Sequence, residues 1–145
     1  CMRHVEKTAL LPYSAEQIFL IVADVAQYGE FLPWCSGSRV LVQNKADMIG
    51  ELELSAPGIK QTFRTKNLLF PYSNITMSLL EGPFSHLQGE WNFKQLGSDG
   101  CRVSMSLQFA FNHRLVEKTF GAVFSVAAEK LVAAFSERAD EIYGR

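Results

Sequence analysis

Acidic and histidine side chains are the groups of this sequence that could do acid–base chemistry. Glu51 and Glu53 stand two positions apart, so on a strand they share a face and could form a carboxylate pair. We favour the alternative, a solvated outer face, because acidic side chains are rarely buried unless they are paired. His4, His86 and His113 lie in separate segments, without partners at a recognised spacing. With no HExxH, GxSxG or P-loop motif, we predict no catalytic residues and no enzymatic activity.

The three cysteines, Cys1, Cys35 and Cys101, form no CxxC or Cys/His pattern. An odd number without such spacing is typical of reduced thiols in a cytosolic protein, rather than of a disulfide framework or a zinc site. We therefore predict no metal ligands and a cytoplasmic location. The sequence also lacks a run of roughly 18 apolar residues, the length that spans a membrane, so we expect no transmembrane segment.

Three cations, Lys60, Arg64 and Lys66, recur at even positions of one predicted strand, opposite Ile59 and Phe63. We call these three cations the basic ridge. Such a row of cations usually forms a solvated outer face. The more specific alternative is that these cations contact phosphate groups, as on RNA. Recognition of single-stranded RNA would need aromatic rings on the same face, and here they point the other way. The formal net charge of -1 provides no overall attraction to nucleic acid, and we predict no DNA partner.

Large apolar side chains gather in two connections. Residues 31–35 read Phe-Leu-Pro-Trp-Cys, an unusual density for a loop. They form either a corner tucked beneath the end of a sheet or an apolar lip at the mouth of a pocket, and the ready burial of aromatic rings favours the corner. Residues 81–84, Glu-Gly-Pro-Phe, present one ring from a tight turn, for which simple turn chemistry is an equally good interpretation.

The first elements are short. Residues 3–11 form a predicted strand, and a helix begins after Ser14, which can cap it. Gln17 stands three residues later and can close a capping box. Apolar residues recur at helical spacing up to Gln27, after which residues 28–33 form a turn or a second small helix.

Beyond residue 37 the apolar period changes from helical spacing to alternation. Loops with Gly, Pro and Asn separate the segments, so we expect a meander of antiparallel strands. The last segment alternates most clearly, which predicts one buried and one solvated face. Gly89, inside a strand, marks a bulge or bend that curves the sheet. The predicted strands span residues 38–45, 49–56, 59–69, 73–81, 86–96 and 101–111.

Residues 113–143 are predicted as one long helix, capped by Asn112. An apolar stripe runs along it from Val116 to Ile142. About thirty residues would span roughly 45 Å, so the helix must cross the curved sheet. The fold class is therefore α+β, and residues 1–145 form one domain, since no repeat or linker interrupts them.

The apolar faces of the sheet and of the long helix have two interpretations. They could be nothing but core, which is the usual role of such a stripe. They could also enclose a cavity, because one long helix on a bent sheet leaves space where the two surfaces diverge. Flexible Met77 and Met105 suit an irregular apolar volume. The residues alone leave both alternatives open.

Four segments carry a resemblance that covers nearly the whole chain. They are Ala9–Gln17; Tyr28 with Phe31–Pro33 and Cys35–Val40; Glu81–Phe84 leading to Leu87, Gly89, Trp91 and Phe93; and Ala134–Phe135 with Arg138, Ala139 and Tyr143. Together these segments resemble the START-domain proteins of the polyketide cyclase and coenzyme Q-binding type, within the helix-grip superfamily.

The resemblance implies a helix-grip fold, in which a curved antiparallel sheet of about seven strands wraps around the C-terminal helix and leaves a hydrophobic tunnel. It implies binding of ubiquinone or a related isoprenoid lipid in support of respiration, with no covalent cofactor. Bacterial members imply a second role, a toxin-like inhibition of translation by association with the large ribosomal subunit, which blocks subunit joining. Family members are not generally enzymes, so a cyclase-like reaction using Glu51 or His86 is the least favoured alternative.

From the apolar faces and this resemblance we predict a set of ligand-binding residues. The set comprises Phe31, Trp34, Phe63, Met77, Leu79, Phe84, Trp91, Met105, Phe109, Phe120, Phe124 and Leu131. The basic ridge of Lys60, Arg64 and Lys66 is the candidate RNA contact. We expect a monomer in the cytoplasm, with the periphery of the inner membrane as an alternative location.

Overall fold

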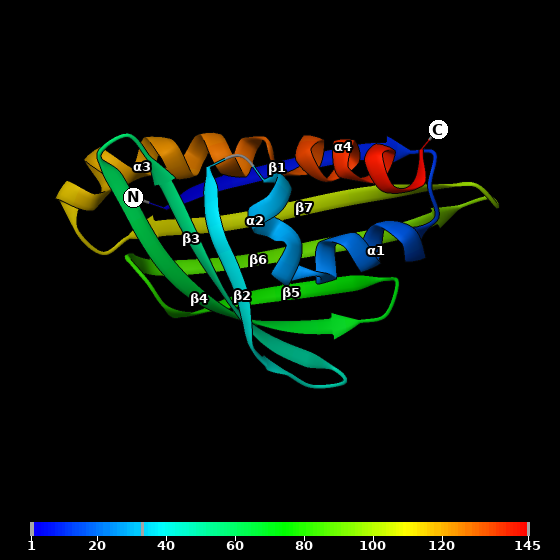
Figure 1. Cartoon of the computed structure of the whole chain (residues 1–145), viewed down its shortest axis with the longest axis horizontal. Coiled ribbons are helices and arrows are strands. Elements are labelled where there is room, and N and C mark those ends of the chain that lie inside the picture. Colours follow the sequence, from blue (N-terminus) through cyan, green and yellow to red (C-terminus); the bar gives the residue numbers. More distant parts are fainter. Residues whose placement is uncertain (1, 33, 145) are drawn as a thin grey trace.

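One curved antiparallel sheet forms the framework of the fold (Figure 1). The computed structural model describes residues 2–32 and 34–144. Within these ranges, seven strands pair in the order β1-β7-β6-β5-β4-β3-β2. Consecutive strands from β2 to β7 are neighbours, as predicted for a meander. The strands are β1 Arg3–Leu11, β2 Cys35–Gln43, β3 Asp47–Ala56, β4 Ile59–Phe70, β5 Asn74–Glu81, β6 Phe84–Leu96 and β7 Gly100–Phe111.

The strand predictions are confirmed, with ends shifted by a few residues. In addition, β1 pairs antiparallel with β7, from Arg3 opposite Phe109 to Leu11 opposite Cys101. This pairing joins the first and the last strand of the chain. The sequence predicted β1 but not its partner, because the pattern within one strand does not specify which distant strand pairs with it.

The curvature of the sheet comes with register shifts, twice between β2 and β3, once between β4 and β5 and once between β6 and β7. Such bulges bend a strand and increase its twist. Gly89 is not one of them, since it pairs regularly with Met77 and Leu107. A Cβ atom at Gly89 would lie 2.5 Å from Cε of Met77 and 3.0 Å from Cδ1 of Leu107. The predicted bulge at Gly89 is therefore wrong, and glycine serves close packing there.

The helices lie against one face of the sheet (Figure 1). They are α1 Ala15–Ala23, the 3-10 turn η1 Val25–Gln27, α2 Tyr28–Phe31, α3 Arg114–Glu129 and α4 Leu131–Tyr143. Ser14 caps α1 as predicted, since its hydroxyl accepts the backbone N–H of Gln17 at 3.1 Å and the Gln17 side chain accepts the N–H of Ser14 at 2.9 Å. The predicted extension of this helix to Gln27 is wrong, because α1 ends where Asp24 leaves the helical backbone. The second small helix is confirmed as α2.

The predicted single C-terminal helix is wrong, because it is broken at Lys130. The axes of α3 and α4 differ by 48°, although no Pro or Gly lies within a turn of the break. Tertiary contacts explain the bend: α3 packs on β1, β4 and β7, whereas α4 packs on β1 and α1. The predicted cap is also wrong, since His113, not Asn112, caps α3 through Nδ1, which accepts the N–H of Leu115 at 3.1 Å.

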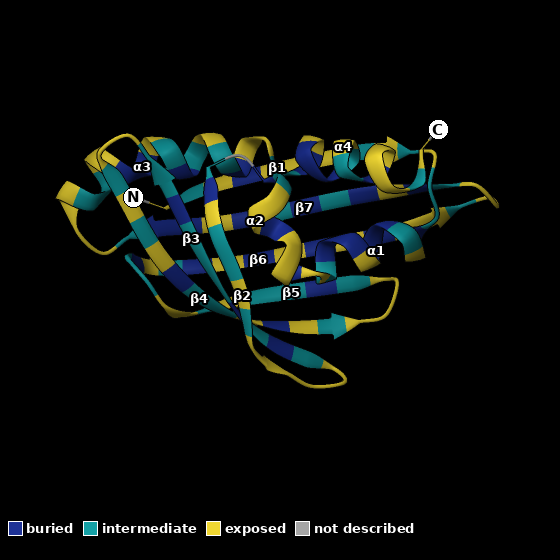
Figure 2. Cartoon of the chain, viewed as in Figure 1, coloured by how far each residue is buried: buried dark blue, intermediate teal, exposed yellow. Residues whose placement is uncertain are grey.

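The core lies between the sheet and the helices, where Figure 2 shows buried residues on facing surfaces. The alternation predicted for the last strand is confirmed in β7. Its inward side chains are all at most 3% exposed: Cys101, Val103, Met105, Leu107 and Phe109. Burial of five such side chains along one strand makes β7 the central support for α3.

Candidate functional site

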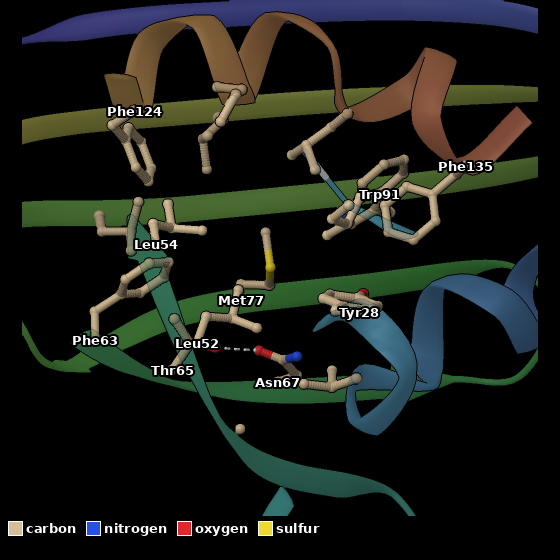
Figure 3. A pocket seen from close by; sticks show the side chains of 18 residues that line it. Tyr28, Leu52, Leu54, Phe63, Thr65, Asn67, Met77, Trp91, Phe124 and Phe135 are labelled. Atoms are coloured by element: carbon tan, nitrogen blue, oxygen red, sulfur yellow. Dashed lines mark hydrogen bonds between the residues drawn. The ribbon is translucent and has the colours of Figure 1, made fainter. Parts of the chain in front are cut away.

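An apolar cavity of about 90 Å³ lies between the sheet and the helices (Figure 3). Side chains from β3 to β7, from η1 and α2, and from both C-terminal helices form its wall. Within residues 2–32 and 34–144, the wall contains no Asp, Glu, His, Lys, Arg or Cys. Of the two interpretations of the apolar faces, the structure therefore supports both in different places: a packed core over most of the sheet and a cavity near the break between α3 and α4.

Five of the predicted ligand-binding residues line this cavity, namely Phe63, Met77, Trp91, Phe124 and Leu131. They come from β4, β5, β6, α3 and α4, so segments distant in sequence converge here. The alternation of the strands and the stripe of the helix had placed all five on inner faces, and the structure brings them together around one volume.

Four of the predicted residues lie in the packed core and do not line the cavity. They are Phe84, Met105, Phe109 and Phe120, each at most 4% exposed. On one side of Phe124 the aromatic rings pack closely: the ring centroid of Phe124 lies 4.7 Å from that of Phe109 and 4.9 Å from that of Phe84. The same inner face of the sheet or helix thus contributes some residues to the core and others to the cavity. The alternation in the sequence does not show which residue belongs to which.

Phe31, Trp34 and Leu79 also lie outside the cavity wall. The ring of Phe31 packs edge-on against Phe135 at 5.5 Å. Trp34 adopts a φ of 62°, and Leu79 is half-buried on β5. Phe31 and Trp34 therefore favour the structural corner, whereas Leu32 between them lines the cavity. Pro33 lies outside the described residues.

Sequence reasoning missed several lining residues. Two of them lie on β4, Thr65 and Asn67, and both share the odd-numbered positions of Phe63, which the alternation had already turned inward. Their odd-numbered positions were the feature of the sequence that could have identified Thr65 and Asn67 as inward-facing. The remaining missed residues are Val25, Tyr28, Leu32, Gly50, Leu52, Leu54, Leu87, Leu107, Ala127, Ala128 and Phe135.

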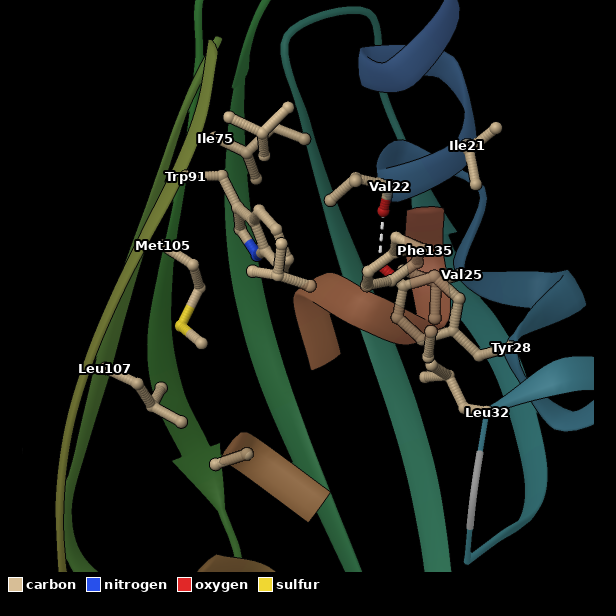
Figure 4. Close-up of a cluster of buried hydrophobic side chains, with 14 of the residues drawn as sticks. Ile21, Val22, Val25, Tyr28, Leu32, Ile75, Trp91, Met105, Leu107 and Phe135 are labelled. Carbon is tan, nitrogen blue, oxygen red and sulfur yellow. Dashed lines mark hydrogen bonds between the residues drawn. The ribbon is translucent and has the colours of Figure 1, made fainter. Parts of the chain in front are cut away.

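The polar groups of the wall are held by specific hydrogen bonds. The hydroxyl of Thr65 donates to Oδ1 of Asn67 at 2.9 Å. The hydroxyl of Tyr28 donates to the carbonyl of Val22, within the buried cluster that Figure 4 shows. Burial raises the pKa of Tyr28 far above its ordinary value, so the phenol is neutral at physiological pH.

The basic ridge lies on the opposite face of β4, and its central cation is already paired. The guanidinium of Arg64 contacts Glu51 at 2.7 Å and Glu81 at 3.0 Å. Lys60 and Lys66 are exposed and form no ion pair within the described residues. The ridge thus offers two lysines rather than three cations to a phosphate group.

Neither residue considered for acid–base catalysis reaches the cavity. Hydrogen bonds from Arg39 and then Arg64 hold the pKa of Glu51 below its ordinary value. This glutamate lies on the outer face, as favoured, but its paired side chain is only 14% exposed and is therefore not solvated. His86 is half-buried, and its Nε2 lacks a hydrogen-bond partner among the described residues. His4 interacts with Ser106 at 2.9 Å on the exposed side of β1.

The two described cysteines, Cys35 and Cys101, are buried and free. Burial raises the pKa of both thiols, which disfavours the reactive thiolate. Cys1 lies outside the described residues. Across residues 2–32 and 34–144, no single helix is both long and apolar enough to cross a membrane.

Comparison with known proteins finds a matching family model, related sequences and a structure with the same fold. The family model described as polyketide cyclase / dehydrase and lipid transport matches residues 11–136. Ribosome association toxin RatA from Vibrio cholerae is 45% identical over 99% of both chains. Coenzyme Q-binding protein COQ10 homolog B, mitochondrial, from Xenopus laevis is 31% identical over 96% of this chain and 59% of that protein. The Zhui aromatase/cyclase from a Streptomyces species shares the fold, with a TM-score of 0.84 at 20% identity, over 97% of this chain and 94% of that chain.

Proposed function

The chain belongs to the polyketide cyclase / dehydrase and lipid transport family, and from this premise we propose that it binds a hydrophobic small molecule without changing it chemically. The proposed ligand is ubiquinone or a related isoprenoid lipid. The observation that carries this proposal is a cavity with an apolar wall to which the described residues contribute no Asp, Glu, His, Lys, Arg or Cys. The predicted START-type family and helix-grip fold are confirmed.

The wall chemistry supports binding rather than catalysis. A cyclase-like reaction needs a group that moves protons next to the substrate, and Glu51 and His86 both lie outside the wall. The hydroxyl proton of Tyr28 is committed to a backbone carbonyl. The fold shared with an aromatase/cyclase therefore does not argue for that activity here, since function depends on the site rather than on the fold.

The cavity is small for the proposed ligand. Pockets for small organic ligands usually measure about 300–1,000 Å³, whereas this cavity measures about 90 Å³. A quinone ring would therefore need the wall to move. The unbranched side chain of Met77 adapts easily to a ligand, and we propose that α4 moves relative to α3 at Lys130, where the helix is already interrupted.

The test is ligand binding to the purified protein. We expect an isoprenoid quinone among its extracted lipids, identified by mass spectrometry, and a melting temperature that rises with added short-chain ubiquinone. Binding to the native state alone stabilises it by about 2.7 kcal/mol at a ligand concentration one hundred times Kd. If no quinone co-purifies and no quinone raises the melting temperature, the proposal is wrong.

Matched variants locate the binding site. Ala127 lines the cavity from α3, whereas Ala122 is exposed on the same helix. We expect Ala127→Phe to abolish the quinone-induced rise in melting temperature, because the new ring occupies the cavity. Ala122→Phe should keep the full rise. An equal response of the two variants would show that the ligand binds elsewhere.

We propose association with the large ribosomal subunit as a second candidate function. It is favoured by one observation, the 45% identity over 99% of both chains to a protein named ribosome association toxin. The exposed Lys60 and Lys66 supply the candidate RNA contact. Both candidate functions are compatible with a cytoplasmic protein, and quinone binding would add contact with the inner membrane.

Co-sedimentation with purified large ribosomal subunits tests this second function. We expect the protein to pellet with subunits at low salt and to be released as salt rises, because phosphate contacts depend steeply on ionic strength. The double variant Lys60→Ala/Lys66→Ala should pellet less than Lys45→Ala/Lys94→Ala, which removes the same charge elsewhere. Absence of wild-type co-sedimentation at low salt would exclude the association, and equal behaviour of the two variants would exclude the ridge as the contact.

A further inference from the structure

Asn67 is a buried amide on the inner face of β4. Asn67 is 5% exposed. Among the described residues it is the only buried residue with an amide or charged side chain. It lines the cavity next to apolar side chains such as Met77. Burying an amide costs free energy unless its polar atoms are hydrogen-bonded. Each donor and acceptor of Asn67 therefore has to be accounted for.

The amide oxygen is satisfied and the amide nitrogen is not. Thr65 donates its hydroxyl to Oδ1 at 2.9 Å, which fixes the orientation of the amide. The nitrogen Nδ2 carries two N–H groups, and neither donates to an acceptor within the described residues. Figure 3 shows this nitrogen on the side of the amide that points away from Thr65. Two hydrogen-bond donors thus remain unused in an apolar cavity.

Two hydroxyl groups of the wall are already paired. The hydroxyl of Tyr28 donates to the carbonyl of Val22, and the hydroxyl of Thr65 donates to Oδ1 of Asn67. The N–H groups of Asn67 have no acceptor within the described part of the chain, so a ligand that pairs with them must bring a hydrogen-bond acceptor.

We infer that Asn67 determines the specificity of the cavity by donating a hydrogen bond from Nδ2 to a carbonyl oxygen of the ligand. The ligand class is then an apolar ring or chain that carries a ketone or quinone oxygen, as opposed to a pure hydrocarbon. This inference rests on the proposed function, because it requires that a hydrophobic molecule enters the cavity. A hydrocarbon would leave both N–H groups unpaired, whereas a carbonyl oxygen satisfies at least one.

Two probes separate this inference from general hydrophobic binding. Decylubiquinone carries quinone oxygens, and dodecylbenzene has a ring and a chain but no oxygen. We expect Asn67→Leu to bind decylubiquinone about fivefold more weakly than wild type, the loss of one net hydrogen bond. Its affinity for dodecylbenzene should be unchanged or higher. Its melting temperature without ligand should fall modestly, because the Thr65 hydroxyl loses its acceptor. The readout that a purely structural Asn67 would not move is therefore the ratio of the two affinities, since a structural loss would weaken both probes alike.

Gln61→Leu is the matched control, because Gln61 is an amide on the same strand that does not line the cavity. It should bind both probes as wild type does. Should Asn67→Leu not fold, the side-chain amide resonance of Asn67 in the wild type provides the readout. We expect this resonance to shift with decylubiquinone and not with dodecylbenzene.

The possible outcomes distinguish the proposed role of Asn67 from the binding of a hydrophobic ligand in general. Equal quinone affinity of Asn67→Leu and wild type, or an unmoved amide resonance in a quinone-saturated protein, would overturn the role of Asn67 and leave hydrophobic ligand binding intact. Binding of neither probe to wild type would overturn both the proposed function and the inference. A selective loss of quinone affinity supports both.

Discussion

Glu51 lies between two guanidinium groups on the outer face of the sheet. Its carboxylate oxygens are 2.6 Å from Nε of Arg39 and 2.7 Å from Nε of Arg64. Arg64 in turn reaches Glu81 at 3.0 Å. Four alternating charges thus connect β2, β3, β4 and β5 side by side. These contacts leave both oxygens of Glu51 engaged and make Arg64 a poor candidate for RNA contact.

The pH dependence of stability follows from the pKa of Glu51. Because pairing lowers this pKa below the ordinary value of 4.5, the folded state binds the proton less readily than the unfolded state does. The contribution of Glu51 is therefore fully present above about pH 4.5 and is lost as the pH falls through the lowered folded pKa. We expect Glu51→Gln to reduce the acid-induced fall of the urea midpoint, measured from neutral pH down to about pH 3.

The control for this measurement is Glu137→Gln, on the exposed side of α4, where the glutamate forms no ion pair within the described residues. This variant should keep the wild-type pH profile. Identical profiles for the two variants would show that the Glu51 cluster does not contribute to acid sensitivity.

At the scale of elements, α1 is fixed at its start by two sets of contacts. Ser14 and Gln17 form the capping box, and the backbone N–H of Ala15 donates to the side chain of Gln95 on β6 at 2.8 Å. Together these bonds satisfy amide groups that a helix leaves unpaired at its N-terminus. The start of α1 is thereby tied to the sheet.

Removing the cap should destabilise the protein measurably. We expect Ser14→Ala to lower the free energy of unfolding by about 1 kcal/mol, because the N–H of Gln17 loses its acceptor. Urea denaturation measures the change. Ser98→Ala, in the exposed turn between β6 and β7, should leave the free energy unchanged, and an equal loss in both variants would contradict a capping role for Ser14.

Phe31 and Trp34 contact the C-terminal helices at and beyond the break between α3 and α4. The ammonium of Lys130 lies 5.6 Å from the ring centroid of Trp34. Farther along α4, the guanidinium of Arg138 lies 4.9 Å from the ring centroid of Phe31. Contacts of this type contribute about 0.5–1 kcal/mol at exposed sites. Phe31 and Trp34 therefore brace the broken helix next to the cavity.

At the scale of the whole molecule, packing is uneven along the C-terminal helices. In the middle of α3, Phe120 packs into the core and Phe124, one turn later, borders both core and cavity. The last turn of α3 brings Ala127 and Ala128 to the cavity, and these side chains reach less far. The volume that they leave open belongs to the cavity.

Keeping this cavity costs stability. At about 24 cal/mol per Å³, a volume of about 90 Å³ corresponds to about 2 kcal/mol relative to a filled core. Natural proteins accept such costs where function needs them. The uneven packing is thus consistent with a binding protein, whose ligand would recover part of this free energy.

Local spacing in the sequence determined the elements of this protein. The six strands of the meander, the cap at Ser14 and the inward side of β7 all follow from periods of two or 3.6 residues and from turn residues. The same periods placed Phe63 and Met77 on inner faces. These features depend on neighbouring residues in the chain, so one sequence was sufficient to predict them.

The tertiary structure alone decided which inner residues border the cavity. Phe120 and Phe124 are one helical turn apart on the same stripe, yet only Phe124 reaches the cavity. The pairing of β1 with β7, the break at Lys130 and the pairing of Arg64 with Glu51 were likewise outside the sequence pattern. Each depends on contacts between residues far apart in the chain, whose distances are set only when the sheet curves and the helices pack on it.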